Sequence, residues 1–132
     1  MTDPRAQSTA IEAQFVARID GIRARFALKL ARNILQTDAA LRQMSGGGND
    51  AVDAVATAYR WFHDAVGICA TIGFEATGQS ARSCDAILVE PFRNQRGLSP
   101  DELAQLTTSL ESLRITALAE TAAPESTQGL VP

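Results

Sequence analysis

The amino-acid sequence predicts an all-α fold, an antiparallel four-helix bundle with an additional N-terminal helix or helix extension. Three observations favour this class. Alanine is abundant, β-branched runs are short, and apolar residues recur at three- or four-residue spacing without the alternation of a strand. The 132 residues fit a single domain. A chain of this size buries roughly two-thirds of its unfolded surface, which is enough for a core between packed helices.

The first helix is expected to run from Thr9 to about Leu41. Its apolar face consists of Ile11, Phe15, Ile19, Ile22, Phe26 and Leu30, which follow helical spacing. Either Ser8 or Thr9 is the expected N-terminal cap, and Gly21 is expected to bend the helix or divide it in two. Residues 1–8 are expected to be flexible because they precede this helix.

The strongest break in the helical pattern is the run of three glycines at 46–48, because glycine loses the most conformational freedom in a helix interior. Asn49 or Asp50 is the expected cap of the second long helix. That helix is expected to run from residue 51 to residue 71 or 72. Gly73 follows it, and a left-handed glycine at this position commonly ends a helix.

A third long helix is expected at 74–89, and Pro91 is expected to end or kink it. The residues at 95–98 form the next connector. Ser99 and Glu102 then have the spacing of a capping box, with a proline between them at the first helical position. These signals predict the start of a last helix.

The last helix is expected to end near Glu120. The tail at 121–132 mixes Pro, Ser, Thr and Gly without an apolar face, which predicts disorder. The helical domain is therefore expected to span 9–120.

Composition and charge exclude several classes of protein. The formal net charge of −3 argues against a general nucleic-acid binder, which would present a basic face. No stretch approaches the ~18 apolar residues of a membrane helix, and the first ten residues lack the apolar core of a signal peptide. We therefore expect a cytoplasmic protein without membrane or nucleic-acid partners. Cys69 and Cys84 are expected to be reduced and buried, no metal site is expected, and any imidazole chemistry falls to His63.

The helix that carries His63 has an expected core face consisting of Val55, Ala58, Phe62, Ala65, Cys69 and Ile72. His63 lies roughly 135° from the centre of that face at 100° per residue. Its neighbours on the helix surface are mostly small or apolar rather than charged. One of them is Gly67, which costs helix stability and leaves space for another molecule to approach the imidazole.

The stretch at 62–74 resembles the signature of histidine phosphotransfer (HPt) domains. His63, Gly67 and Gly73 match the phosphorylated histidine and the two glycines that follow it in that family. The resemblance implies that His63 is a phosphoacceptor and that the chain is a phosphocarrier rather than an enzyme. The glycines at 46–48 lack the Lys and Ser or Thr of a phosphate-binding loop, so neither ATP binding nor autophosphorylation is expected.

One position departs from the family pattern, because many members carry lysine three residues after the histidine and this chain has Val66. The family often places polar residues further along, at the positions of Gln79, Arg82 and Asp85. We expect Arg82, or Arg60 one turn before the histidine, to supply the positive charge that phosphoryl oxygens need. Asp85 is expected to orient the imidazole through its other nitrogen. The alternative is that Arg82 and Asp85 form only a solvated surface pair.

The resemblance implies that the histidine exchanges a phosphoryl group with an aspartate of a response-regulator receiver domain in two-component signalling. The partner is a receiver domain or a hybrid histidine kinase, whose receiver supplies Mg²⁺, and this chain needs no cofactor of its own. Docking is expected on the surface formed by Tyr59, Val66, Gly67 and Ala70. Two alternatives stay open. One is a non-phosphorylated HPt-like adaptor that binds a receiver or kinase. The other is an unrelated helical bundle that matches the signature by chance, which a buried His63 would support.

Overall fold

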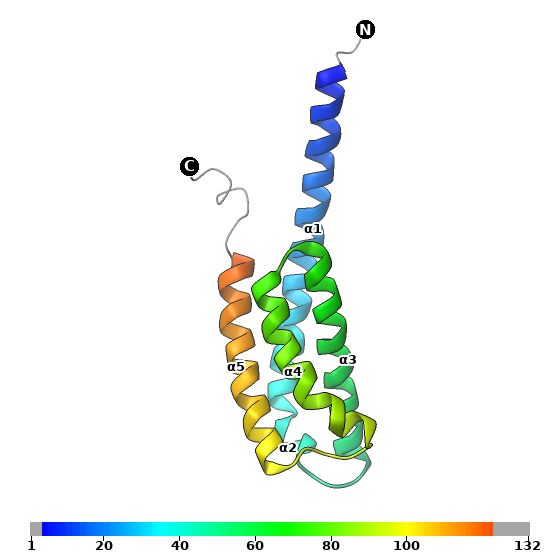
Figure 1. Cartoon of the computed structure of the whole chain (residues 1–132), viewed down its shortest axis with the longest axis vertical. Helices are drawn as coiled ribbons and strands as arrows, with labels where there is room; N and C mark the ends of the chain where they lie inside the picture. Colours follow the sequence, from blue (N-terminus) through cyan, green and yellow to red (C-terminus); the bar gives the residue numbers. More distant parts are fainter. Residues whose placement is uncertain (1–3, 123–132) are drawn as a thin grey trace.

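Figure 1 shows the computed structural model of the chain, which describes residues 4–122. Every regular element in this range is a helix: α1 (Pro4–Ala39), α2 (Leu41–Met44), α3 (Asn49–Ile72), α4 (Glu75–Arg93) and α5 (Pro100–Ala122). The four long helices run alongside one another. The short α2 lies at one end of them, near the loops that join α2 to α3 and α4 to α5 (Figure 1). The all-helical class is therefore confirmed. Between residues 4 and 122, no helix has both the length and the apolar character needed to cross a membrane.

The core lies where the apolar faces of the long helices meet. All six residues expected on the core face of α3 are buried, and so is the face of α4 made of Thr77, Ala81, Cys84 and Leu88. α1 adds Phe26, Leu30 and Ile34, and α5 adds Leu106, Leu110 and Leu113. Helical spacing therefore identified the inward face of α3 correctly.

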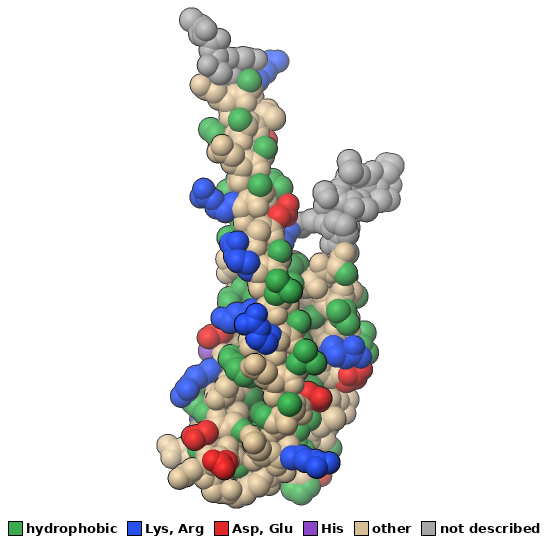
Figure 2. Space-filling view, turned by 180° about the vertical axis from the view of Figure 1, so that it is seen from behind, with side chains coloured by type: hydrophobic (Ala, Val, Ile, Leu, Met, Phe, Trp, Pro, Cys, Tyr) green, Lys and Arg blue, Asp and Glu red, His purple; other side chains and the backbone are tan. Residues whose placement is uncertain are grey.

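The N-terminal half of α1 projects beyond the other helices (Figure 1). Its side chains at Ile11, Phe15 and Val16 are 65%, 64% and 56% exposed, and burial in α1 begins only at Phe26. Figure 2 shows hydrophobic side chains spaced along this projecting part. The stripe expected to face the core along the whole helix does so only in its second half, because no other described helix extends beside the first half.

The expected start of α1 is wrong. The helix begins at Pro4, so residues 4–8, expected to be flexible, are helical. Proline suits a first turn because its fixed φ is helical and no backbone N–H is needed there. The hydroxyl of Thr9, expected to cap the helix, instead donates to the Arg5 carbonyl inside it at 2.9 Å. The helix also continues without interruption through Gly21.

The two ends of α3 differ in how well the sequence predicted them. The N-cap is Gly48, with φ 86°, and no side chain caps the helix, so the caps expected at Asn49 or Asp50 are wrong. Gly73 confirms the expected left-handed end, with φ 84° and its N–H donated to the Cys69 carbonyl at 3.0 Å. This glycine allows the chain to reverse direction tightly, so α3 and α4 run antiparallel (Figure 1).

α4 does not end at residue 89 but continues through Pro91 to Arg93. Pro91 is fully buried, and that packing offsets the backbone hydrogen bond that proline cannot make. The first turn of α4 is capped from α5, because the amides of Ala76 and Thr77 donate to the Glu120 carboxylate at 3.0 and 2.8 Å. Burial raises the pKa of Glu120, but these hydrogen bonds outweigh that effect and leave the pKa below its usual value.

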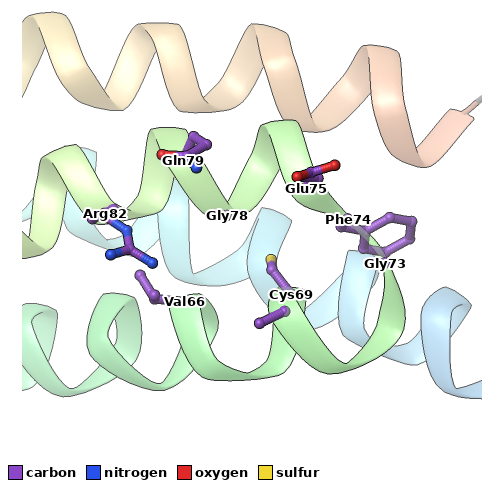
Figure 3. Close-up of a pocket in the computed structure, with 9 residues that line it drawn as sticks. Val66, Cys69, Gly73, Phe74, Glu75, Gly78, Gln79 and Arg82 are labelled. Carbon is purple, nitrogen blue, oxygen red and sulfur yellow. The ribbon is translucent and has the colours of Figure 1, made fainter.

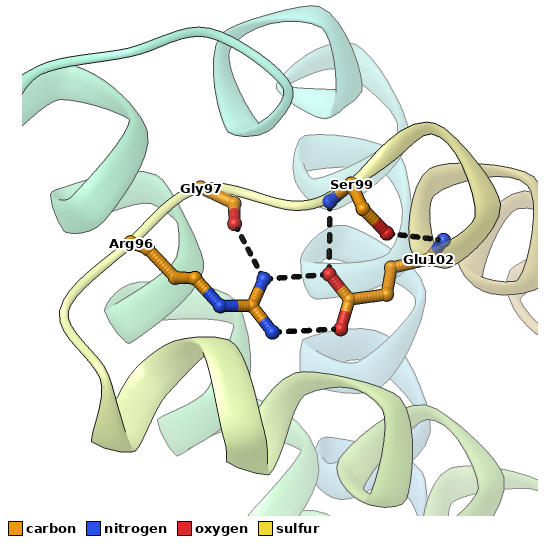
Figure 4. Close-up of polar contacts among 4 residues, drawn as sticks. All are labelled: Arg96, Gly97, Ser99 and Glu102. Atoms are coloured by element: carbon orange, nitrogen blue, oxygen red, sulfur yellow. Dashed lines mark hydrogen bonds and ion pairs between the residues drawn. The ribbon is translucent and has the colours of Figure 1, made fainter.

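The capping box at the start of α5 is confirmed (Figure 4). The Ser99 hydroxyl accepts from the Glu102 amide at 3.2 Å, and the Ser99 amide donates to the Glu102 carboxylate at 2.8 Å. Arg96 adds a two-pronged ion pair to the same carboxylate, at 2.7 and 3.0 Å. The hydrogen bond from Arg96 is the main reason that the pKa of Glu102 falls to about 2. The expected tail mostly lies outside the described residues, and its first two residues, Thr121 and Ala122, belong to α5.

Candidate functional site

His63 lies in the middle of α3, on the side away from the core. Its neighbour Phe62 is fully buried, whereas the imidazole side chain is 61% exposed. The amphipathic pattern of α3 produces this difference, because consecutive helical residues lie 100° apart around the axis. The histidine is therefore available to another molecule, and the burial that would have supported an unrelated helical bundle is not observed.

Asp85 of α4 faces one ring nitrogen of this histidine. Its Oδ1 lies 3.4 Å from Nδ1 of His63, and the Asp85 side chain is only 22% exposed. Oδ1 itself is shielded from solvent and makes no well-aligned hydrogen bond within residues 4–122. A 3.4 Å separation exceeds the ~2.9 Å of a well-formed N–H···O bond, so a small ring movement would convert this contact into one. Because Nδ1 faces the carboxylate, Nε2 is the nitrogen left for chemistry.

The face of the imidazole is covered by an aromatic stack. The Tyr59 ring, one turn earlier on α3, lies 5.3 Å from the His63 ring with 24° between their planes. Tyr59 in turn stacks on Phe92 of α4, with centroids 4.3 Å apart and 15° between planes. These three rings are called the aromatic stack below. They show that Tyr59, expected to belong to a docking surface, packs within its own chain.

A groove of about 350 Å³ lies between α3 and α4 (Figure 3). We call it the α3/α4 groove. Its lining consists of Val66, Cys69, Ala70, Gly73, Phe74, Glu75, Gly78, Gln79 and Arg82. The walls approach closely because Gly78 has no side chain, and a Cβ there would lie 3.1 Å from that of Cys69.

Arg82 lies at the end of this groove nearest the histidine. Figure 3 shows its side chain extending from α4 toward Val66. Val66 is one turn after His63, and Arg82 is one turn before Asp85 on the antiparallel helix. Over the described range, Arg82 forms no ion pair with any carboxylate, so the alternative of an Arg82–Asp85 surface pair is wrong. The guanidinium charge remains open to a ligand.

The other expected site residues are less closely joined to the histidine. A Cβ at Gly67 would meet nothing within 4 Å, so the space beside the imidazole is open as expected. Ala70 and Gln79 lie further along the α3/α4 groove, and Gly73 lies where α3 ends. Arg60 is exposed on α3 and has no ion pair among residues 4–122.

Phe92 is the one member of the site that sequence reasoning missed. It was left outside the helix because Pro91 was expected to end or kink α4 near residue 89. A usable signal existed, since Phe92 is seven residues after Asp85 and helical residues seven apart share a face. Continuing α4 for one more turn would have placed both residues on the side that faces α3.

The two cysteine thiols near this site are poor candidates for nucleophilic chemistry. Burial raises the pKa of Cys69 to about 11 and that of Cys84 to about 12, with nearby carboxylates adding to the effect. Both thiols are free and buried, as expected, and a thiol with so high a pKa is a poor nucleophile. Between residues 4 and 122, no three His, Cys, Asp or Glu side chains gather into a group that could hold a metal ion.

Comparisons of the chain with protein-family models, curated proteins and solved structures find no match. The chemistry of the site therefore has to be argued from its own residues.

Proposed function

We propose that the chain is a phosphorelay intermediate of the HPt type, which accepts a phosphoryl group on His63 from a receiver-domain aspartate and passes it to another. In this proposal α1, α3, α4 and α5 make an antiparallel four-helix bundle, and the N-terminal half of α1 is its extension. The observation that carries the proposal is the exposed imidazole, with Nδ1 3.4 Å from a shielded carboxylate oxygen and open space beside it at Gly67.

The chemistry requires Nε2 to act as the nucleophile. Its lone pair attacks phosphorus, a P–N bond forms, and the P–O bond to the partner's aspartate breaks, so that the carboxylate leaves with the electron pair. Positive charge then develops on the imidazole ring. Asp85 lies beside Nδ1, where its carboxylate stabilises that charge and accepts the Nδ1 proton in a hydrogen bond. The partner's receiver domain supplies the acidic pocket and the Mg²⁺.

Arg82 takes the role that lysine has in many HPt domains. Positions one turn apart on a helix are separated by about 5 Å along its axis, so a side chain level with Val66 is close to a phosphoryl group on His63. A guanidinium binds phosphoryl oxygens through several donors at once. The open charge of Arg82 beside Val66 supports this role.

The receiver is expected to dock over Gly67 and along the α3/α4 groove. The groove combines an apolar floor with polar residues of α4 at its rim, a composition typical of transient interfaces. In this proposal the partner's receiver supplies the metal, so most of the contribution of the chain is to position the imidazole.

Phosphotransfer from a phosphorylated receiver tests the proposal. The wild type should acquire label that is stable in base and labile in acid, as expected of a P–N bond, and His63→Gln should acquire none. Candidate donors are the receiver domains encoded in the same genome. If none of them labels the wild type, the phosphorelay function is wrong.

The role of Arg82 has a rescue test. Arg82→Ala should slow transfer or shorten the phosphohistidine lifetime, with the free energy of unfolding within about 0.5 kcal/mol of the wild type. Adding Val66→Lys to that variant should restore transfer, because a cation returns to the same place. Arg60→Ala is the matched control for loss of one exposed arginine near the histidine. Equal effects of Arg60→Ala and Arg82→Ala would contradict a specific role for Arg82.

The missing lysine at Val66 favours one second candidate, a non-phosphorylated HPt-like adaptor that occupies a receiver or kinase surface. In that case His63→Gln should bind the receiver as tightly as the wild type does, and no transfer should occur to either protein.

A further inference from the structure

The aromatic stack has a geometry that bears on the reactivity of the histidine. A solvent-exposed imidazole ordinarily rotates about two side-chain bonds, so its nitrogens have no fixed direction. His63 is 61% exposed, yet it has a partner at its edge and another at its face. Asp85 lies 3.4 Å from Nδ1, and the Tyr59 ring lies nearly parallel to the imidazole at 5.3 Å.

We propose that Tyr59, held by Phe92, is a positioning residue that fixes the plane of the His63 ring so that Nδ1–H points to Asp85 and Nε2 points to the phosphoryl donor. The inference rests on the proposed phosphorelay function. It assigns to Tyr59 a role within the chain, in place of the docking role expected from its position on the helix surface.

The edge and face contacts restrict different motions of the ring. A carboxylate beside Nδ1 opposes rotation that would exchange the two nitrogens, but it leaves the ring free to tilt about the Nδ1–Oδ1 direction. A parallel ring at the face opposes that tilt. Together they leave one orientation, which is what in-line attack on phosphorus requires.

Tyr59 can hold the imidazole only if its own ring is held. Phe92 provides this support, because its ring lies 4.3 Å from that of Tyr59 with only 15° between the planes. Phe92 and Asp85 are both on α4, whereas Tyr59 and His63 are both on α3. The orientation of the reactive nitrogen therefore depends on how these two helices pack against each other.

Nuclear magnetic resonance of the isolated, ¹⁵N-labelled protein tests the positioning without any partner. In the wild type, the ring-nitrogen shifts of His63 should report the tautomer with the proton on Nδ1, and Tyr59–His63 ring contacts should appear as nuclear Overhauser effects. Tyr59→Phe keeps the stacked ring and should preserve the tautomer. Tyr59→Leu should move the shifts toward those of a free histidine side chain, and Phe92→Leu should move them in the same direction by a smaller amount.

A matched control separates positioning from general loss of packing. Phe26→Leu removes a buried ring whose centroid lies 6.0 Å from that of Phe74, with the two ring planes tilted by 33°. This variant should lower the melting temperature and leave the His63 shifts unchanged. Wild-type shifts in Tyr59→Leu would overturn the proposal, as would an equal change of shifts in Phe26→Leu.

Transfer kinetics separate positioning from docking. Tyr59→Leu should slow the phosphotransfer step about tenfold or more, because misplacement of a reacting group by about 1 Å can cost about 100-fold in rate. Receiver affinity should stay within about twofold of the wild type, and Tyr59→Phe should restore the rate. Lower affinity with an unchanged transfer rate would return Tyr59 to a docking role and overturn the inference. If the shifts respond as expected but no receiver labels the wild type, the ring is positioned and the phosphorelay function is what fails.

Discussion

Gly67→Ala is expected to stabilise the protein and impair its function at the same time. Gly67 is a helix-interior residue on the same face as His63, four positions later. A Cβ at this position would meet nothing within 4 Å, so alanine fits the folded chain without displacing any neighbour. The described residues therefore offer no packing reason for glycine at this position.

The size of the stability change follows from helix propensity. Alanine is more favourable than glycine in a helix interior by about 0.5–1 kcal/mol, and no clash reduces that gain. For a domain of this size, that gain corresponds to a rise of roughly 2–5 °C in melting temperature. If the chain is a phosphorelay intermediate as proposed, the added methyl group would project into the space that a receiver needs to reach the imidazole, so we expect phosphotransfer to slow at least about tenfold.

Two measurements on one preparation test this prediction. Urea denaturation gives the free energy of unfolding, and the rate of label transfer from a phosphorylated receiver gives the functional change. Gly21→Ala is the matched control, since a Cβ there would meet only the end of the Arg25 side chain, at 3.4 Å. It should also stabilise α1 without changing the transfer rate.

A Gly67→Ala variant that is more stable and transfers at the wild-type rate would refute the argument that open space at this glycine serves the approach of a partner. A destabilised variant would refute the structural premise, because it would mean that the side of α3 at Gly67 is covered.

Other predictions concern stability. Glu102→Gln should lose about 1–2 kcal/mol at pH 7, less than the full pKa shift implies because its Arg96 partner is 41% exposed. The difference in unfolding free energy between wild type and variant should disappear as the pH falls from 4.5 toward 2. The Glu102 carboxylate has a pKa of about 2 in the folded chain, whereas in the unfolded chain it takes up its proton near pH 4.5. Urea titrations at pH 7 and pH 3 check this. Gly97→Ala should cost about 2–3 kcal/mol by thermal denaturation, because its Cβ would lie 2.5 and 2.6 Å from the carbonyl oxygens of Gly46 and Met44. Glu120→Ala should cost about 1 kcal/mol in the same assay, because the first turn of α4 loses its cap.

The parts of the fold that were predictable are those that depend on local spacing. The core faces of α3 and α4, the left-handed end at Gly73 and the capping box at Ser99 each follow from residues within one or two turns. The cap of α4 was not predictable in this way. It comes from Glu120, more than forty residues later in the chain, and only the packing of α5 against α4 brings it there.

The length of α1 shows a different limit. The apolar stripe of the helix continues from Phe26 back to Ile11, and spacing alone predicts that all of it faces a core. Whether a stripe is buried depends on how far the neighbouring helices extend. In this chain they end well short of Ile11, so the same pattern is buried at one end of α1 and exposed at the other (Figure 1).

The site itself was partly predictable because a tight antiparallel turn fixes which residues of two helices face each other. α3 and α4 reverse direction at Phe74, and both helices rise 1.5 Å per residue, so equal numbers of residues before and after the turn come level. His63 and Asp85 are each eleven residues from Phe74, and Val66 and Arg82 are each eight residues away.

Counting residues from the turn does not place Phe92 opposite Tyr59, because Tyr59 is three residues nearer to the turn than Phe92 is. Their stacking depends on two features that counting cannot supply. α4 must remain helical through Pro91, and both side chains must be long enough to meet across one helical turn. The polar contact of the imidazole is thus set by backbone geometry, whereas its aromatic support is set by side-chain size. For that reason Asp85→Asn should preserve the Tyr59–His63 ring contacts in nuclear Overhauser spectra, whereas Phe92→Leu should weaken them.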